Sequence, residues 1–199
     1  MAANMKEIKE RIDSVKSTSQ ITNAMNIVSS TKFKRFQVLT LKSRSYARAV
    51  DEAFDNLVAS LTGNKFVIFD GKSEVRRVGI IVMTSDRGLS GSFNSNTHRK
   101  LEEMRRNFQK ENKEISVITI GKKAKDYCKT RNIDVDSEYT QMIPETMFEK
   151  AKKISEDVVQ FYLDDYYDEV YLIYSKFVSA VEYNIQTEKL LPIEKKEGL

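Results

Sequence analysis

The chain of 199 residues is long enough to bury one sizeable hydrophobic core and to carry an extended element beside it. Hydrophobic residues make up 40% and charged residues 31% of the sequence, which is typical of folded proteins and not of disordered ones. A single cysteine excludes an intrachain disulfide and favours a reducing compartment. The apolar runs fall far short of the ~20 residues that cross a bilayer, and the N-terminus resembles neither a secretory signal nor an organellar presequence.

The positive charge of the chain is concentrated near its beginning, although the net charge is only +4. No Asp or Glu occurs from Ser14 to Val50, and that stretch contains Lys16, Lys32, Lys34, Arg35, Lys42, Arg44 and Arg48. A basic, acid-free segment favours an acidic partner: nucleic acid, an anionic membrane or an acidic protein surface. Charge alone does not choose among the three.

Residues 1–62 are predicted to form one long helix. Apolar residues recur at steps of three and four from Ile8 to Leu61, and no Pro or Gly occurs before Gly63. A helix of this length needs a partner helix along its apolar stripe, as in a coiled coil. Polar interruptions at 16–20 and 29–32 indicate a loosely packed coil whose surface also meets something else.

The composition changes after a predicted linker, residues 63–77. Residues 78–193 alternate strand and helix patterns, which is typical of an α/β sheet with helices packed on it. Strands are expected at 78–83, 115–120, 170–177 and 181–191, and helices around 101–108 and at 122–131 and 147–162. The predicted fold class is therefore α/β, with a long N-terminal helix, a Rossmann-like domain at 78–193 and a short last segment at 194–199.

A polar loop, residues 84–94, follows the first predicted strand. Open α/β sheets bind ligands at this place, and the next helix N-terminus attracts anions. The loop contains Asp86, Gly88, Gly91 and Asn94, but neither G-x-G-x-x-G nor G-x-x-x-x-G-K-[ST]. The spacing favours a tight strand-to-helix turn, in which the glycines relieve backbone strain and Asp86 or Asn94 caps the following helix. A nucleotide site is the alternative.

No catalytic or metal constellation is found elsewhere in the sequence. The only histidine, His98, is predicted to be a solvated residue at a helix start, and Cys128 a small buried residue. The acidic residues at 164–169 end a helix and lead into a strand, whereas metal sites usually need clustered His, Cys or carboxylates. The tyrosines at 162–174 are predicted to lie in the core and at interfaces. The residues therefore predict no enzyme and no cofactor.

Two segments far apart in the chain together resemble the gamma subunit of F-type ATP synthases. Residues 8–33 are similar to the family's opening I-x-x-R-I-x-S-V-x-N-T-x-Q-I-T-K-A-M-x-M-V-A-A-S-K-L, and residues 85–94 are similar to its S-D-R-G-L-C-G-G-F-N. Residues 188–193 also resemble the end of the family's α/β domain. The departures are mild, such as Ser90 and Ser92 where the family has Cys and Gly.

The resemblance implies a rotor shaft that carries out no chemistry itself. An N-terminal and a C-terminal helix form an antiparallel coiled coil inside a hexamer of three alpha and three beta subunits (alpha3-beta3). The α/β domain lies at the foot, against the epsilon subunit and the membrane c-ring. Ion flow turns the ring and the shaft, and the shaft drives the beta sites through different nucleotide affinities. Such a subunit is peripheral, on the cytoplasmic face of the bacterial cell membrane, and touches the membrane only through the complex.

The resemblance also implies contacts with the beta subunits. Met25 matches the family's A-M position, where the helix passes acidic beta-subunit loops. Arg87 matches the Arg of S-D-R-G, which points toward a beta-subunit loop. Lys32, Lys34 and Arg35 become contact candidates because they lie on the acid-free helix.

The family continues past this point into a long C-terminal helix, whereas the sequence ends at Leu199. We therefore expect a fragment or a truncated product, whose apolar stripe at 5–60 self-associates or frays in isolation. Two other functions stay open: a nucleotide-sensing α/β domain, and a nucleic-acid binder. The second is favoured by the basic helix, but its charges are spread around the helix instead of along one strip.

Overall fold

The structure is a computed structural model that describes residues 2–60 and 67–194, with the side chains of 4–58 and 67–194. The described residues form two compact units. One is helix α1, and the other is an α/β unit that extends from Val67 to Glu194.

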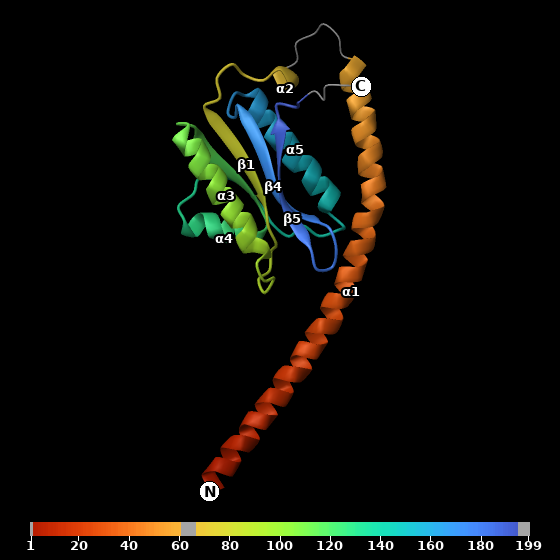
Figure 1. Cartoon of the computed structure of the whole chain (residues 1–199), viewed down its shortest axis with the longest axis vertical. Coiled ribbons are helices and arrows are strands. Elements are labelled where there is room, and N and C mark those ends of the chain that lie inside the picture. The colour runs from red at the N-terminus through yellow and green to blue at the C-terminus, as the bar shows by residue number, and fades with distance from the viewer. Residues whose placement is uncertain (1, 61–66, 195–199) are drawn as a thin grey trace. The chain divides into compact units, whose positions relative to one another are not determined.

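Helix α1 extends without a break from Ala2 to Ser60 over 59 residues, which at about 1.5 Å per residue is about 88 Å. It is drawn as one long, gently curved rod, red to orange, in Figure 1. Several hydroxyl groups bond to the backbone of the preceding turn, among them Thr18 to the Ser14 carbonyl at 2.9 Å and Thr22 to the Thr18 carbonyl at 2.8 Å. Such back-bonding satisfies the hydroxyls within the helix and favours curvature.

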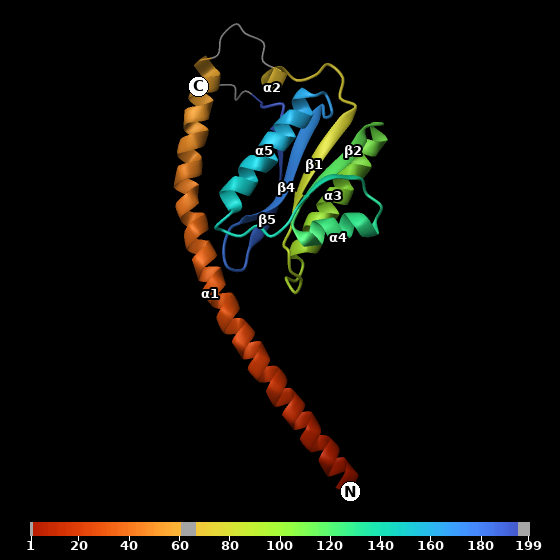
Figure 2. The same ribbon diagram turned by 180° about the vertical axis from the view of Figure 1, so that it is seen from behind.

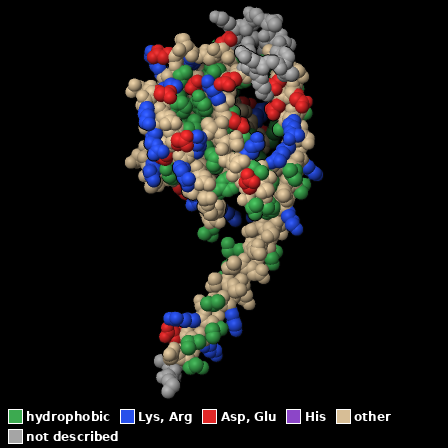
Figure 3. All heavy atoms as spheres, viewed as in Figure 1, with side chains coloured by type: hydrophobic (Ala, Val, Ile, Leu, Met, Phe, Trp, Pro, Cys, Tyr) green, Lys and Arg blue, Asp and Glu red, His purple; other side chains and the backbone are tan. Residues whose placement is uncertain are grey.

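Most large apolar side chains of α1 are exposed, whereas Val58, near its end, is buried. Val15 is 68% exposed and Met25 53%, and Ile8, Ile12, Ile21, Val28, Phe36, Leu39 and Val50 are exposed as well. Figure 3 shows hydrophobic and basic side chains along the N-terminal half of this helix. The expected long N-terminal helix is therefore confirmed, and its apolar stripe is available for contact.

A five-stranded sheet forms the centre of the α/β unit, with strand order β3-β2-β1-β4-β5. The first four strands are parallel, and β5 is antiparallel to β4. This order places the reversal of strand order between β1 and β4, as in Rossmann-like folds. The strands are β1 Arg77–Met83, β2 Glu114–Ile120, β3 Val135–Tyr139, β4 Glu169–Phe177 and β5 Tyr183–Leu191.

Helices cover both faces of the sheet (Figures 1 and 2). Helices α3 (Phe93–Lys110) and α4 (Lys122–Thr130) pack on one face, and α5 (Met147–Leu163) packs on the other. Strand β1 supplies both cores, because its side chains alternate: Ile80 points to the α3–α4 face and Ile81 to the α5 face. The expected fold class, a long helix with a Rossmann-like α/β domain, is confirmed.

Three local features differ from the sequence-based expectation. Strand β3 was not predicted, because its Val-Asp-Ser-Glu-Tyr sequence is short and polar. The apolar patch in the predicted linker contains a four-residue helix, α2 (Val67–Asp70). Strand β5 begins at Tyr183 and not at Val181, because residues 178–182 form the turn closed by the Val178 N–H to the Glu182 carbonyl.

Two of the tyrosines and the cysteine lie in the core, as expected. Tyr162 and Tyr167 are buried against the α5 face of the sheet. Cys128 is fully buried in α4, and burial raises the pKa of its thiol to about 11. A thiol with so high a pKa holds almost no thiolate at neutral pH and is unreactive. Within the described residues, none of the helices combines the length and apolar character needed to cross a membrane.

Gly121 is predicted to be indispensable to the α/β unit. It lies between β2 and α4 with a φ of +98°, and a Cβ there would come within 2.2 Å of the Thr84 carbonyl oxygen. Gly121→Ala should lower the free energy of unfolding by at least about 2 kcal/mol, measured by urea denaturation.

Gly88→Ala is the matched control, because its Cβ would meet only the Lys123 side chain, at 3.6 Å. It should change the free energy of unfolding by less than about 0.5 kcal/mol. Equal effects of the two substitutions would contradict the assignment of strain to Gly121.

Candidate functional site

The side chain of Asn94 holds together the two ends of the loop between β1 and α3, residues 84–92. The Asn94 amide group donates to the hydroxyls of Ser85 at 2.9 Å and Ser90 at 3.0 Å. Its carbonyl oxygen accepts from the Ser85 backbone N–H at 3.0 Å. One side chain from the first turn of α3 therefore joins the two ends of the loop and fixes its shape.

Asp86 holds the loop to the rest of the unit. Its two carboxylate oxygens accept from the backbone N–H of Lys122 at 2.9 Å and of Gln141 at 3.0 Å. Lys122 is the first residue of α4, so the carboxylate lies at the positive end of that helix dipole. The prediction that Asp86 or Asn94 caps α3 is wrong, because α3 follows Ser92 and has no side-chain cap. Asp86 binds the start of α4 instead. This is a tertiary contact that local spacing does not reveal.

The backbone donors at the N-terminus of α4 are taken by this loop. Besides the bond from Lys122 to Asp86, the Lys123 N–H donates to the Ser85 carbonyl at 3.1 Å. The Ala124 N–H donates to the Thr84 hydroxyl at 2.7 Å. A helix N-terminus at this edge of a sheet is where phosphates bind in nucleotide-binding folds. Here a carboxylate, a carbonyl and a hydroxyl of the chain itself fill that place.

The middle of the loop, Arg87 to Leu89, projects from this fixed frame and is called the tip. All three tip residues are exposed, and Leu89 is 97% exposed. Leu89 has a φ of +59° and Gly91 a φ of +56°, so the chain turns sharply on both sides of Ser90. The tip presents an exposed guanidinium and an exposed isobutyl group on a loop that Asn94 and Asp86 hold in place, which suits protein contact better than chemistry.

A second anchor holds the start of α3 to strand β5. The Tyr183 hydroxyl lies 3.0 Å from the Ser92 hydroxyl and accepts from the Asn96 amide at 3.0 Å. The ring of Phe93 meets the Tyr183 ring edge-on, with centroids 5.4 Å apart. Sequence reasoning did not identify Tyr183 because its partners are about 90 residues away along the chain.

The structure places the predicted site residues in two groups. Asp86, Arg87, Gly88, Gly91 and Asn94 come together in the one loop described above. The others belong to α1 and are exposed: Met25, Lys32, Lys34 and Arg35.

The helical period distributes the α1 candidates around the axis. Lys32 is seven residues after Met25 and lies on the same face, whereas Lys34 is nine residues after Met25 and lies on the opposite face. Within the described residues no ion pair is formed by Lys32 or Lys34. The helix thus presents positive charge on more than one side.

His98 is not the solvated residue that was expected. Its ring stacks on Tyr127 with centroids 4.0 Å apart, and its Nε2 atom is buried without a hydrogen-bond partner in the described structure. Burial lowers the pKa of His98, against the opposing effect of a backbone hydrogen bond to Lys123. The expectation failed because the start of α3 packs on α4, which the sequence of α3 alone does not show. The described residues contain no group of His, Cys, Asp or Glu that could hold a metal ion.

Comparison with known proteins defines the family. The family model described as ATP synthase matches residues 4–198. The ATP synthase gamma chain of Fusobacterium nucleatum is 45% identical over 193 residues, covering 97% of this chain and 68% of the relative. That of Alkaliphilus metalliredigens is 36% identical over 198 residues, covering 100% of this chain and 67% of the relative. The chain belongs to the gamma chain family of ATP synthases.

A solved structure supports the fold. A chain in the structure of the Tetrahymena thermophila mitochondrial ATP synthase central stalk and c-ring matches with a TM-score of 0.51 and 27% identity. The match covers 61% of this chain and 52% of that chain. The chain described here thus spans about half the length of that solved relative.

The half-buried His98 is predicted to make stability depend on pH. Its pKa is lower in the folded than in the unfolded chain, so the unfolded chain binds the proton more readily. The free energy of unfolding should therefore fall as the pH drops below the unfolded pKa of about 6.5, with a slope of at most about 1.4 kcal/mol per pH unit.

The measurement is urea denaturation between pH 7.5 and pH 5, compared with His98→Phe, which keeps a ring to stack on Tyr127. The difference between the two proteins isolates the histidine from other titrating groups. A constant difference across this range would show that His98 titrates alike in both states.

Proposed function

We propose that the chain is the central-stalk rotor subunit that couples transmembrane ion flow to ATP synthesis or hydrolysis at the beta subunits, without being catalytic itself. The observation that carries this proposal is α1: 59 residues of helix whose large apolar side chains are mostly exposed and whose basic stretch lacks acidic residues. The apolar and basic side chains of such a helix are best satisfied when other chains surround it. Membership of the gamma chain family supports the same assignment.

The proposed mechanism uses contact surfaces and no chemistry. An α1 rod inside an alpha3-beta3 hexamer presents different side chains in different directions, such as Met25 on one face and Lys34 on the opposite face. Each beta subunit then meets a different surface, and the contacts favour one of its existing conformations over the others. Rotation of the rod moves these preferences from one beta subunit to the next. Lys32, Lys34 and Arg35 are the proposed partners of acidic beta-subunit loops.

The tip of the β1–α3 loop is the proposed beta contact of the α/β unit. Arg87 supplies a charge that pairs with a carboxylate, and the neighbouring Leu89 supplies apolar area. Asn94 and Asp86 hold the loop so that little conformational entropy is lost on contact. The remaining proposed partners are the epsilon subunit and the c-ring. The location is the cytoplasmic face of the bacterial cell membrane, reached only through the complex.

A nucleotide-binding function is the alternative that the fold class raises. The Asp86 carboxylate at the start of α4 argues against it, because a phosphate placed there would meet a negative charge and no free N–H. Titration of the chain with ATP and Mg²⁺ by calorimetry should give no saturable heat. Tight binding would favour a nucleotide-sensing domain instead.

Arg87→Ala is predicted to weaken the complex without harming the fold. The side chain is exposed, so the free energy of unfolding should change by less than about 0.5 kcal/mol. The affinity for the alpha3-beta3 hexamer should fall about tenfold, which corresponds to about 1.4 kcal/mol for a lost charge-assisted contact. Titration of labelled chain with the hexamer gives the dissociation constant.

Arg106→Ala serves as the matched control, since Arg106 is an exposed arginine at the other end of α3. Its affinity should equal that of the unchanged chain. A similar loss in both variants would indicate a general effect of positive charge and not a contact of the tip.

A further inference from the structure

Helix α2 is the first described element of the α/β unit, and the sequence before it leads back to α1. It contains only four residues, none of them buried. A helix of one turn has no stability of its own, since the first turn orders several residues for a single hydrogen bond. The orientation of α2 therefore depends on the contacts that other elements make with it.

Two of these contacts join α2 to the rest of the unit through backbone carbonyls. The Tyr162 hydroxyl, from α5, donates to the Val67 carbonyl at 3.2 Å. The Ile193 N–H, just after β5, donates to the Ile68 carbonyl at 2.8 Å. The first and the last described segments of the unit thus lie side by side and are tied to each other.

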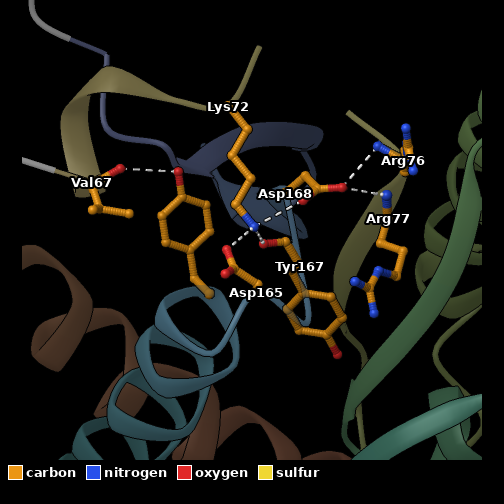
Figure 4. Close-up of polar contacts among 8 residues, drawn as sticks. Val67, Lys72, Arg76, Arg77, Asp165, Tyr167 and Asp168 are labelled. Carbon is orange, nitrogen blue, oxygen red and sulfur yellow. Dashed lines mark hydrogen bonds and ion pairs between the residues drawn. The ribbon is translucent and has the colours of Figure 1, made fainter. Parts of the chain in front are cut away.

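Lys72, two residues after α2, makes the third contact. Its ammonium group lies 2.9 Å from an Asp168 carboxylate oxygen, 2.8 Å from an Asp165 oxygen and 3.1 Å from the Tyr167 carbonyl. Figure 4 shows the lysine extended from the loop after α2 toward Asp165 and Asp168. All three donor positions of the ammonium group are used, and its side chain is only 21% exposed.

Asp168 completes the corner from the other side. Its second carboxylate oxygen accepts from the backbone N–H groups of Arg76 and Arg77, each at 2.8 Å, and its side chain is 10% exposed. Burial alone would raise the pKa of Asp168, but the bonds to Lys72 and to the two N–H groups lower it. One carboxylate therefore holds the loop between α2 and β1 at Lys72 and again where β1 begins.

The bonds around Lys72 and Asp168 are directional, and directional bonds resist twisting. Apolar packing opposes separation of two elements but is non-directional. Charge-assisted hydrogen bonds have a preferred distance and angle, and in a partly dry site they are stronger than at the surface. The connection between α2 and the sheet thus has its orientation set by polar bonds.

We infer that the Lys72–Asp168 ion pair fastens residues 67–72, where the chain enters the α/β unit, to the sheet against torque, which makes Lys72 a positioning residue for mechanical coupling. The inference rests on the proposed rotor function. In the proposed rotor, the chain that enters the unit at α2 carries part of the torque between the shaft and the foot, and a loose attachment of this segment to the sheet would let one slip against the other. ATP would then be hydrolysed without the matching ion transport.

Lys72→Met tests the inference in the complete ATP synthase complex that contains the chain, reconstituted into vesicles. The substitution keeps most of the side-chain length but removes the ammonium group. ATP hydrolysis should stay within about twofold of the unchanged complex, while ions pumped per ATP should fall about fivefold, the lower range of coupling between sites. Lys72→Arg, which retains the charge, should restore part of the ratio. A purely stabilising role would change the melting temperature and leave this ratio unchanged in assembled complex.

Lys153→Met is the control, because it breaks an exposed ion pair with Asp157 elsewhere in the same unit. It should leave the pumping ratio unchanged. If the complex with Lys72→Met does not assemble, Asp165→Asn tests the inference instead. This substitution removes the charge of one exposed partner of Lys72 and keeps Asp168. Its ratio should also fall, but by less than that of Lys72→Met, because Asp168 keeps its bond to Lys72.

A ratio equal to that of the unchanged complex, in assembled Lys72→Met or in Asp165→Asn, would overturn the inference. Failure of the proposed function has a different signature. In that case the complex with the unchanged chain would hydrolyse ATP without pumping ions at all.

Discussion

The constraint on which the rest depends is the exposure of α1. A 59-residue helix with exposed apolar side chains and an acid-free basic stretch has a large area of unsatisfied surface. Exposed apolar area is unfavourable in water, and the positive charges attract acidic groups. The proposed function therefore needs surrounding chains with complementary apolar and acidic groups. Membership of the gamma chain family names the setting in which such chains occur.

The α/β unit has a fold that often binds ligands at one edge of its sheet. At this edge, groups of the chain itself occupy the place where a ligand would bind. Thr84, Ser85 and Asp86 satisfy the start of α4, and Asn94 closes the loop that they begin. The unit thus has a loop held by side-chain bonds, an exposed Arg87–Leu89 tip, and a polar corner in which Lys72 is bonded to Asp165 and Asp168. These features fit the proposed role.

Sequence alone predicted the features that are encoded locally. The long helix was visible because apolar steps of three and four continue for sixty residues without Gly or Pro, and β1 and β2 were visible as short apolar runs. Strand β3 was missed because its polar residues are held by pairing with β2. The loop at 84–94 was located, but its partners were not: Asp86 bonds to α4 and His98 stacks on α4, and such tertiary contacts leave no periodic trace. Lys72 was missed for the same reason, since Asp168 is 96 residues away.

The most direct test of the central claim observes rotation. The only native cysteine, Cys128, is buried with a raised pKa, so Arg99→Cys on the exposed surface of α3 provides one reactive thiol for a fluorescent probe. The labelled chain is assembled with immobilised alpha3-beta3 hexamer, and probe orientation is followed by single-molecule polarisation while ATP is added. The rotor account predicts that the probe turns in one direction in steps that follow ATP hydrolysis. A probe that keeps a fixed orientation while the same complex hydrolyses ATP at its full rate would contradict it.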